Sequence, residues 1–450
     1  MSSEKEEVVE NTNLLDSDPL TQVDDEKSDL FDDDEGLVKS TTTEEATDPG
    51  SMTNELDSRD LFITVSNPEK HITTMETYIT YKITTKTTRS IFDNSEYSVQ
   101  RRYQDFVWLR NKLEEKHETH LIPPLPSKFI MKGMLDRFNR QFTQTRCRAL
   151  HNFLDRISRH SVISFDENLQ VFLTAKAYEF TAFRKQSESF MSRVGGSVKS
   201  ISTAAVRLKD RDPEFDEVLN QVTQFGEKIG VLERVAERLH AEKKEFVAEL
   251  KEFSPTFSMW SASEDDVIAP IMTSTSSAVE ACAEAAEANL KIHEFEYMPP
   301  LREYVLYCDV VKQVLRRRDN FQLQHDKVVA ELQRKQDEKE NLPKSDQSYS
   351  VGALMGKSAN EVKDQKELKL EQQIEEISKR RDDLNDKLEC ANANLRSDVD
   401  RWKVDKLHDM AQIFDDLADS QIQFHQQCLS AWEHILPAMQ EKDQSTDYET

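Results

Sequence analysis

The sequence predicts an α+β domain with a three-stranded antiparallel sheet, followed by an all-α domain of three long helices with coiled-coil spacing. Apolar residues alternate with period two only between about residues 60 and 101, which is the spacing of half-buried strands. Beyond residue 210 they recur every three or four residues over long stretches. Only 9 glycines occur in 450 residues and 32% of the chain is charged, which indicates long exposed helices rather than one compact globule.

Residues 60–180 form the predicted α+β domain, because turn-forming residues separate three alternating runs and amphipathic segments follow them. The strands are expected at Leu61–Val65, closed by Asn67-Pro68, at Tyr78–Thr85 and at Tyr97–Arg101. The helices are expected at Asp105–Lys116, at about Leu135–Arg159 and at Glu167–Phe180. A segment of this length is enough for one compact domain.

Charge is unevenly distributed along the chain, whose net charge is −26. Residues 1–59 are acidic, rich in Ser, Thr and Asp and poor in aromatics, which predicts a disordered tail; residues 441–450 are a second predicted tail. Residues 60–180 hold 14 acidic and 18 basic residues. The α+β domain therefore favours an anionic ligand or surface, while no nucleic-acid partner is expected.

The junction between the third strand and the first helix carries Arg101-Arg102-Tyr103. Side chains at such a junction can converge on a ligand without disturbing a core. The arginine guanidinium matches phosphate oxygens two at a time, and the tyrosine ring offers a flat apolar face. The alternative is a solvated strand end with one core aromatic. The Pro-rich turn at Pro123–Pro126 and the basic residues beyond it favour a binding site.

Residues 186–209 form a predicted cationic amphipathic helix between the two domains. Apolar residues recur at spacings of three and four, and no acidic residue occurs between Ser189 and Lys209. Such a helix typically lies in a membrane interface; a helix packed against the following bundle is the alternative. The face that would contact the membrane includes Phe190, Val194, Val198 and Ile201.

Residues 210–440 are predicted to form three long antiparallel helices with apolar seams. Proline marks the start of the first helix and a bend in the second. The expected helices are Pro213–Phe257, about Glu264–Glu338 with a bend or break at Met298-Pro299-Pro300, and Ile374–Ile435 after a mobile loop at Leu342–Asn360.

These seams are too long and narrow to be buried within one chain, so dimerisation is expected. Lys243 occupies one seam position of the first helix. A buried charge at a seam position selects partners at some cost in stability, which indicates pairing with a different chain, although a homodimer stays open.

The cysteines and the hydropathy pattern predict a cytoplasmic protein. The five cysteines are scattered, with no Cys-x-x-Cys pair, which indicates free thiols in a reducing compartment. No apolar segment follows Met1 and no run approaches 18 apolar residues, so any membrane contact is expected to be peripheral.

No catalytic or cofactor-binding motif is expected to function. His117-Glu118-Thr119-His120 holds two histidines, but not at the His-Glu-x-x-His spacing of zinc enzymes. The chain has no Walker loop, no Gly-x-Gly-x-x-Gly and no Gly-x-Ser-x-Gly motif. The sequence thus predicts no enzyme, no metal site and no cofactor.

The motif at Arg101–Phe106, with Pro123–Pro126 and with Arg146 inside a later helix, resembles the PX (phox-homology) phosphoinositide-binding domain. A PX-like domain followed by an amphipathic helix and three long helices resembles the PX-BAR class of sorting nexins. The runs Trp260–Glu264 and Glu303–Tyr307 look most like the sorting nexin 7 and sorting nexin 30 group. The resemblance covers all of the chain except its tails.

The resemblance implies a role for each residue of a phosphoinositide pocket. Arg102 would bind the 3-phosphate of phosphatidylinositol 3-phosphate, and Tyr103 would stack under the inositol ring. Lys128 would meet the 1-phosphate, and Arg146 would hold the 4- and 5-hydroxyls. Arg101 would be a surface companion rather than a ligand. Each role suits the side chain: a fork for a phosphate, a point charge for the diester, a planar donor for two hydroxyls.

The loop after the Pro-rich turn would dip into the bilayer beside this pocket, through Met131, Met134 and Leu135; core-facing methionines are the alternative. The helical domain carries basic clusters at Arg316–Arg318 and Lys379–Arg381, but residues 181–450 are acidic overall. Membrane affinity is therefore expected to sum a lipid-specific site, an inserted helix and the avidity of a dimer.

The resemblance implies a peripheral adaptor on the cytoplasmic side of early endosomes. Members of this group sort cargo into recycling tubules, pair with sorting nexin 4, and are linked to autophagy. The chain is accordingly expected to bind phosphatidylinositol 3-phosphate, to form a BAR-mediated heterodimer with sorting nexin 4, and to serve intracellular protein transport. The alternative is a structural coiled-coil tether without specific lipid recognition.

Overall fold

The computed structural model describes most of the chain between residues 59 and 439. The described residues are 59–74, 76–126, 138–193, 208, 211–342, 359–437 and 439. All of them belong to one compact unit, Asp57–Thr450. The predicted tail at residues 441–450 and the predicted tail at residues 1–59, except Arg59, lie outside the described residues, and so does most of the predicted amphipathic helix.

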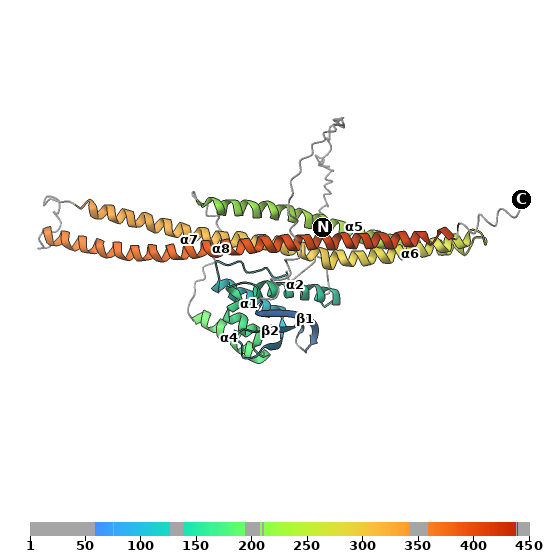
Figure 1. The fold of residues 1–450 in the computed structure, drawn as a ribbon, viewed down its shortest axis with the longest axis horizontal. Coiled ribbons are helices and arrows are strands. Elements are labelled where there is room, and N and C mark those ends of the chain that lie inside the picture. The colour runs from blue at the N-terminus through green and yellow to red at the C-terminus, as the bar shows by residue number, and fades with distance from the viewer. Residues whose placement is uncertain are drawn as a thin grey trace, which may run out of the picture. The chain divides into compact units, whose positions relative to one another are not determined.

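Three antiparallel strands form one sheet in the order β1-β2-β3, which confirms the predicted meander; Figure 1 labels the paired strands β1 and β2. The strands are β1 (Leu61–Ile72), β2 (Thr77–Thr87) and β3 (Glu96–Arg102). One predicted end is wrong, because β1 continues past Asn67-Pro68 through a bulge between Ser66 and Glu69. Asn67 has a φ of 46°, a left-handed conformation that asparagine adopts more readily than most residues, so the strand resumes after the bulge.

Helices complete the α+β domain and enclose an aromatic core. They are α1 (Tyr103–Lys116), α2 (Arg140–Ser158), the 3₁₀ turn η3 (Ile163–Phe165), α3 (Glu167–Thr174) and α4 (Ala177–Arg193). The Phe106 ring meets the rings of Phe153 and Phe172 edge-on, at centroid separations of 6.5 and 5.1 Å. The predicted single helix at Glu167–Phe180 is wrong, because Ala175 is extended, with φ −68° and ψ 136°, and separates α3 from α4.

The described part of the helical domain contains three long helical segments. They are α5 (Pro213–Ser261), the α6–η4–α7 segment (Ala269–Ile292, His293–Tyr297 and Met298–Glu340) and α8 (Ala359–Glu433). The bend expected at Met298-Pro299-Pro300 takes the form of the π turn η4 directly before these residues. Both prolines lie in the first turn of α7, where a missing N–H costs no helical hydrogen bond. The predicted all-α domain after an α+β domain is thus confirmed.

The first predicted seam is buried in its first half and turns outward in its second. Val222, Ile229 and Ala236 of α5 are buried, where α5 packs on α6 and α7. Further along α5, Phe246 is 53% exposed while its neighbour Val247 is 6% exposed. In the second half of α5 the residues at the predicted seam positions, such as Phe246, therefore face outward. The residues one position later, such as Val247, face the core.

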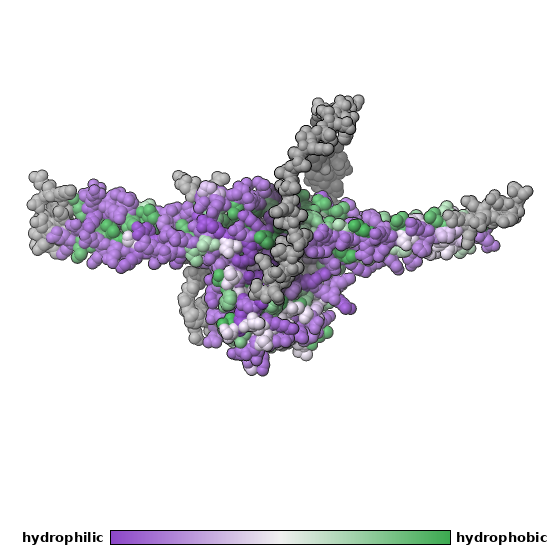
Figure 2. Space-filling view, viewed as in Figure 1, coloured by the Kyte–Doolittle hydropathy of each residue, from purple (hydrophilic) through white to green (hydrophobic). Residues whose placement is uncertain are grey.

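Two stripes of exposed apolar side chains run along the helical domain, and Figure 2 shows hydrophobic patches along both of its arms. The stripe on α5 has a spacing of seven and consists of Leu239, Phe246 and Phe253. The stripe on α8 and just beyond it has spacings of seven and eight and consists of Leu407, Phe414, Ile422, Leu429 and Leu436. Among the described residues, no helix is both long and apolar enough to span a membrane.

Lys243 has a polar partner within its own chain. Its Nζ donates to Oδ1 of Asn289 on α6 at 3.2 Å, and Nδ2 of Asn289 donates to the Ser420 carbonyl of α8 at 3.2 Å. Burial lowers the pKa of Lys243. This polar link ties α5, α6 and α8 together, so the position of Lys243 is explained without a second chain.

Candidate functional site

Arg101 is buried and stabilises the end of α3. The residue is 1% exposed, its Nε donates to the Phe172 carbonyl at 2.9 Å, and its Nη2 donates to the Ala175 carbonyl at 2.6 Å. Burial lowers its pKa to about 10. The predicted surface position is therefore wrong, because Arg101 satisfies carbonyls that a helix end leaves unpaired. The alternation of β3 through Val99 places Arg101 on the core side and could have shown this.

Arg102 points the opposite way and is accessible. It is the last residue of β3 and the N-cap of α1, and its side chain is 42% exposed. Its backbone N–H donates to Oδ2 of Asp105 at 2.8 Å, which fixes the junction. The guanidinium carbon lies 3.3 Å from the centre of the Tyr78 ring, and Nη1 lies 2.5 Å from Oε1 of Glu76. An anion that binds Arg102 would have to displace only the Glu76 carboxylate, which is itself exposed to solvent.

Tyr103 and Arg146 lie together beside this junction. The guanidinium carbon of Arg146 is 4.7 Å from the centre of the Tyr103 ring and 4.3 Å from that of Phe142. The Tyr103 hydroxyl donates to the Pro126 carbonyl at 2.6 Å, so it holds the Pro-rich turn next to the pair. Burial raises the pKa of Tyr103, which keeps the phenol a neutral donor.

The three described residues of the predicted pocket come from the end of β3, the start of α1 and the middle of α2. The Arg102 guanidinium lies on the Tyr78 ring and the Arg146 guanidinium on the Tyr103 ring; such groups suit a ligand that combines a phosphate with a hydroxyl-bearing ring. The excess of basic residues in the α+β domain favours the same class of ligand. Arg146 is only 9% exposed, so its predicted role and those of Arg102 and Tyr103 stay predictions.

The remaining predicted residues lie outside the described side chains, so their roles stay predictions. They are Lys128, Met131, Met134, Leu135, Phe190, Val194, Val198 and Ile201. The backbone of Phe190 belongs to α4, which runs to Arg193.

A second arginine site joins α2 to the helical domain. Nη2 of Arg156 lies 3.0 Å from Glu303 and 2.7 Å from Asp409, and its side chain is 7% exposed. The rings of Tyr304 and Tyr307 lie 5.6 and 5.3 Å from the guanidinium carbon. Burial alone would lower the pKa of Arg156, but Glu303 and the other anionic groups around it raise the pKa. Arg156 is therefore a charged structural residue of the joint between the domains.

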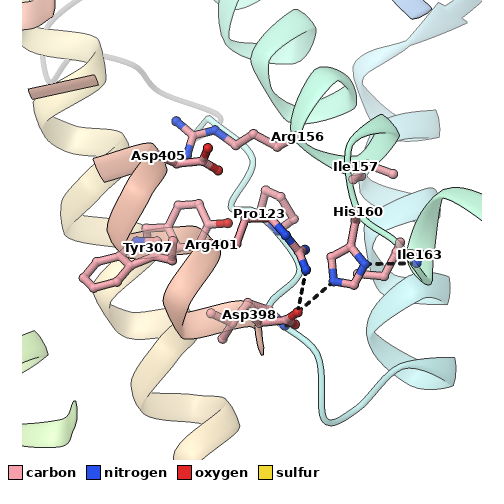
Figure 3. A pocket seen from close by; sticks show the side chains of 11 residues that line it. Pro123, Arg156, Ile157, His160, Ile163, Tyr307, Asp398, Arg401 and Asp405 are labelled. Atoms are coloured by element: carbon pink, nitrogen blue, oxygen red, sulfur yellow. Dashed lines mark hydrogen bonds and ion pairs between the residues drawn. The ribbon is translucent and has the colours of Figure 1, made fainter. Parts of the chain in front are cut away.

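Asp398 of α8 is the acceptor for a second group of donors at this joint (Figure 3). Its Oδ2 accepts from the backbone N–H of Leu121 at 2.8 Å and lies 3.0 Å from Nδ1 of His120. Its Oδ1 lies 3.1 Å from Nε2 of His160 and 3.4 Å from Arg401. Burial alone would raise the pKa of Asp398, but its hydrogen bonds to His120 and His160 lower it overall. The carboxylate therefore stays charged in the joint.

His120, His160 and Asp398 could chelate a metal by distance, and in the described part of the chain they are the group of three that does so. The hydrogen bonds of His160 argue against it. Its Nδ1 accepts from the N–H groups of Val162 and Ile163 at 3.1 and 3.2 Å, so the proton of the neutral ring is on Nε2, facing Asp398. A metal on Nε2 would require a protonated Nδ1 against two donors. The cluster is therefore better explained as a set of polar contacts that hold α8 against the α+β domain than as a metal centre.

This joint was not anticipated from the sequence. The His117–His120 motif suggests only a metal site, which its spacing argues against, whereas the partner of His120 lies 278 residues further along the chain. No local spacing can indicate such a pair.

The basic cluster at Arg316–Arg318 is not a continuous surface patch. Arg318 is buried and donates through Nε to Oδ1 of Asn392 at 2.8 Å, and Arg317 pairs with Glu114 of α1. Arg316 is exposed. Two of the three cations are therefore used inside the molecule, which weakens the case for membrane scaffolding by this cluster.

Comparisons with known proteins agree with the two-domain architecture. A PX domain model matches residues 89–176, and a model described as Vps5 C terminal like matches residues 190–438. Sorting nexin-30 of Mus musculus is 42% identical over 389 residues, covering 86% of this chain and 80% of that protein. Sorting nexin-7 of Homo sapiens is 39% identical over 396 residues, covering 87% and 93%.

A solved structure shares the fold. The cryo-EM structure of the SNX-BAR Mvp1 tetramer matches with a TM-score of 0.55 at 17% identity, covering 83% of this chain and 99% of that one. At this identity the match bears on the fold alone, and it agrees with an α+β domain joined to long helices.

Proposed function

The chain belongs to the PX-BAR sorting nexins, and on that premise we propose that it is a non-enzymatic adaptor that binds phosphatidylinositol 3-phosphate on early endosomes. Proteins of this family associate peripherally with membranes and act in endosomal trafficking; their PX domains bind phosphoinositides and their BAR domains dimerise. The similarity to sorting nexin-30 and sorting nexin-7 supports the narrower assignment.

The contrast between the two neighbouring arginines is the observation that carries this proposal. Arg101 is committed to the carbonyls at the end of α3, whereas Arg102 is exposed at the junction next to Tyr103. A charged fork that is both accessible and held by its backbone is what recognition of a phosphate requires. Arg102 would bind the 3-phosphate, Tyr103 and Arg146 the inositol ring and its hydroxyls, and Lys128 the 1-phosphate.

Dimerisation is supported by the two exposed apolar stripes of the helical domain. Their spacing of seven to eight residues is that of a coiled-coil seam, and side chains of this size are rarely left in long exposed rows. We propose that α5 and α8 use them to pair with a second BAR domain, that of sorting nexin 4, for cargo recycling and the membrane traffic of autophagy.

Membrane contact beyond the headgroup site is assigned to two segments. Met131, Met134 and Leu135 would insert beside the pocket, and Phe190, Val194, Val198 and Ile201 would lie in the interface. Summing such contacts with the headgroup site in a dimer raises avidity. The isolated PX domain should accordingly bind vesicles less tightly than the full chain.

Flotation with vesicles of stated composition tests the lipid assignment. The full chain should bind vesicles that contain phosphatidylinositol 3-phosphate and not matched vesicles that contain phosphatidylinositol. Arg102→Ala should weaken binding at least about tenfold, since a charge-assisted contact contributes about 1.5–3 kcal/mol. Arg316→Ala, which removes an exposed arginine of α7, is the control. Equal binding by wild type and Arg102→Ala would favour the coiled-coil tether.

A further inference from the structure

We propose that Tyr78 and Glu76 set the phosphate affinity of Arg102: the Tyr78 ring positions its guanidinium, and the Glu76 carboxylate occupies it until a phosphate takes its place. This inference rests on the proposed function and adds two residues to it. Neither residue belongs to the arginine–tyrosine motif, and both come from the β1–β2 hairpin.

The sheet register places the Tyr78 ring under Arg102. Thr80 of β2 is the direct cross-strand partner of Arg102, and Tyr78 lies two residues before Thr80, so both side chains share one face of the sheet. Tyr78 is thus the diagonal neighbour of Arg102, within reach of a long side chain. The guanidinium lies 3.3 Å above the ring centre, which orients its fork through a cation–π contact.

The next strand in turn supports the Tyr78 ring. His71 of β1 is paired directly with Tyr78, and the two rings stack at a centroid separation of 5.1 Å with 20° between their planes. Nε2 of His71 lies 2.8 Å from Oγ1 of Thr80. Imidazole, phenol ring and guanidinium therefore form three layers, one from each strand, so the direction of Arg102 is determined by the sheet.

The turn between β1 and β2 fixes the position of Glu76. The Glu76 carbonyl accepts from both Oγ1 and N of Thr73, at 2.8 and 3.0 Å, and the Glu76 N–H donates to Oγ1 of Thr73 at 3.1 Å. This closed turn holds the Glu76 backbone where its carboxylate reaches Nη1 of Arg102 at 2.5 Å. The contact is therefore built into the hairpin rather than made by a free loop.

The competition between Glu76 and a phosphate follows from the geometry. The carboxylate and a phosphate oxygen need the same N–H groups of Arg102, and a carboxylate left beside a bound phosphate would repel it. The Glu76 side chain is 57% exposed, and exposed ion pairs are weak, so a phosphate that binds two N–H groups at once can replace it. Glu76 lowers the affinity without closing the site.

Four variants of the full chain test both residues on vesicles with phosphatidylinositol 3-phosphate, with phosphatidylserine vesicles as the comparison for general anion attraction. Glu76→Gln should tighten binding roughly two- to fivefold, the effect expected of one exposed ion pair. Glu96→Gln removes the same charge at the other end of β3 and should leave binding unchanged. Tyr78→Ala should weaken binding, and Tyr78→Phe should restore it, because the ring and not the hydroxyl supports the guanidinium.

The outcomes separate this inference from the proposed function. If Arg102→Ala abolishes binding but Glu76→Gln behaves like wild type or like Glu96→Gln, the Glu76 part is overturned and the lipid site stands. If Tyr78→Phe fails to restore binding, the positioning part is overturned. Binding by Glu76→Gln in the absence of wild-type binding would support a stronger competition, and no binding by either would overturn both proposals.

Discussion

The pocket junction and the joint between the domains are built from the same groups and differ in burial. Arg102 lies on the Tyr78 ring beside one carboxylate and is 42% exposed. Arg156 lies near two tyrosine rings, pairs with two carboxylates and is 7% exposed. In water a carboxylate can be exchanged for a ligand at small cost, whereas in the interior separation of the pair leaves an uncompensated charge. The difference in burial therefore makes Arg102 the arginine that we propose as a ligand site and Arg156 a structural residue of the joint.

The largest effect is expected in the joint. Arg156→Ala should reduce the free energy of unfolding by about 3–5 kcal/mol, because the half-buried carboxylates of Glu303 and Asp409 would lose their cation inside the joint. Chemical denaturation of the full chain measures this loss, with Arg316→Ala as the exposed control. A loss below about 1 kcal/mol would show that the ion pairs of Arg156 contribute as little to stability as an exposed ion pair such as that of Arg102.

The adjacent arginines allow the sharpest test of the comparison. Arg101→Ala should cost about 2–4 kcal/mol, because the carbonyls of Phe172 and Ala175 would lose their donors inside the core. Arg102→Ala should change the free energy of unfolding by less than about 0.5 kcal/mol while it weakens vesicle binding. Thermal and urea unfolding measure the changes in the free energy of unfolding, and flotation measures the change in vesicle binding. A stability loss in Arg102→Ala equal to that of Arg101→Ala would refute the division of roles.

The joint should also be sensitive to acid, unlike the pocket arginine. Burial lowers the pKa of His160 below its ordinary 6.5, so its stabilising contribution is complete above pH 6.5 and is lost as the pH falls below that value. Protonation would place an N–H against those of Val162 and Ile163. The unfolding free energy should therefore fall less between pH 7.5 and pH 5.5 in His160→Gln than in wild type. If the unfolding free energies of wild type and His160→Gln change equally with pH, His160 does not contribute to the acid sensitivity of the joint. The control is His408→Gln, because the His408 side chain is exposed.

The smallest effect on the stability of one chain is expected at the exposed stripe of α5. Phe246→Asp should change that stability by less than about 0.5 kcal/mol but should shift the mass of the purified protein, alone or with a candidate partner, towards that of single chains. Val247→Ala, at the neighbouring buried position, should instead destabilise each chain and leave its association intact. Light scattering separates the two, and an unchanged dimer in Phe246→Asp would exclude this stripe from the interface.

Local patterns in the sequence determined the elements of this protein and the accessible half of its candidate site. The period of two predicted the three strands, and the spacing of three and four predicted the long helices, because each period reflects one backbone geometry. The same alternation, continued by two residues beyond Val99, separates buried Arg101 from exposed Arg102. Such patterns could not predict the partners of Lys243. Asn289 lies 46 residues after Lys243, and Ser420 lies 131 residues after Asn289.

Only the tertiary structure decided which charged side chains are paired inside the molecule. The pairs of Asp398 with His120 and of Arg156 with Asp409 bridge 278 and 253 residues, and Glu76 meets Arg102 because two strands bring them together. The sequence shows the number and the kind of such charged groups. Their partners and their exposure follow from long-range packing, and exposure decides whether a cation can bind a ligand.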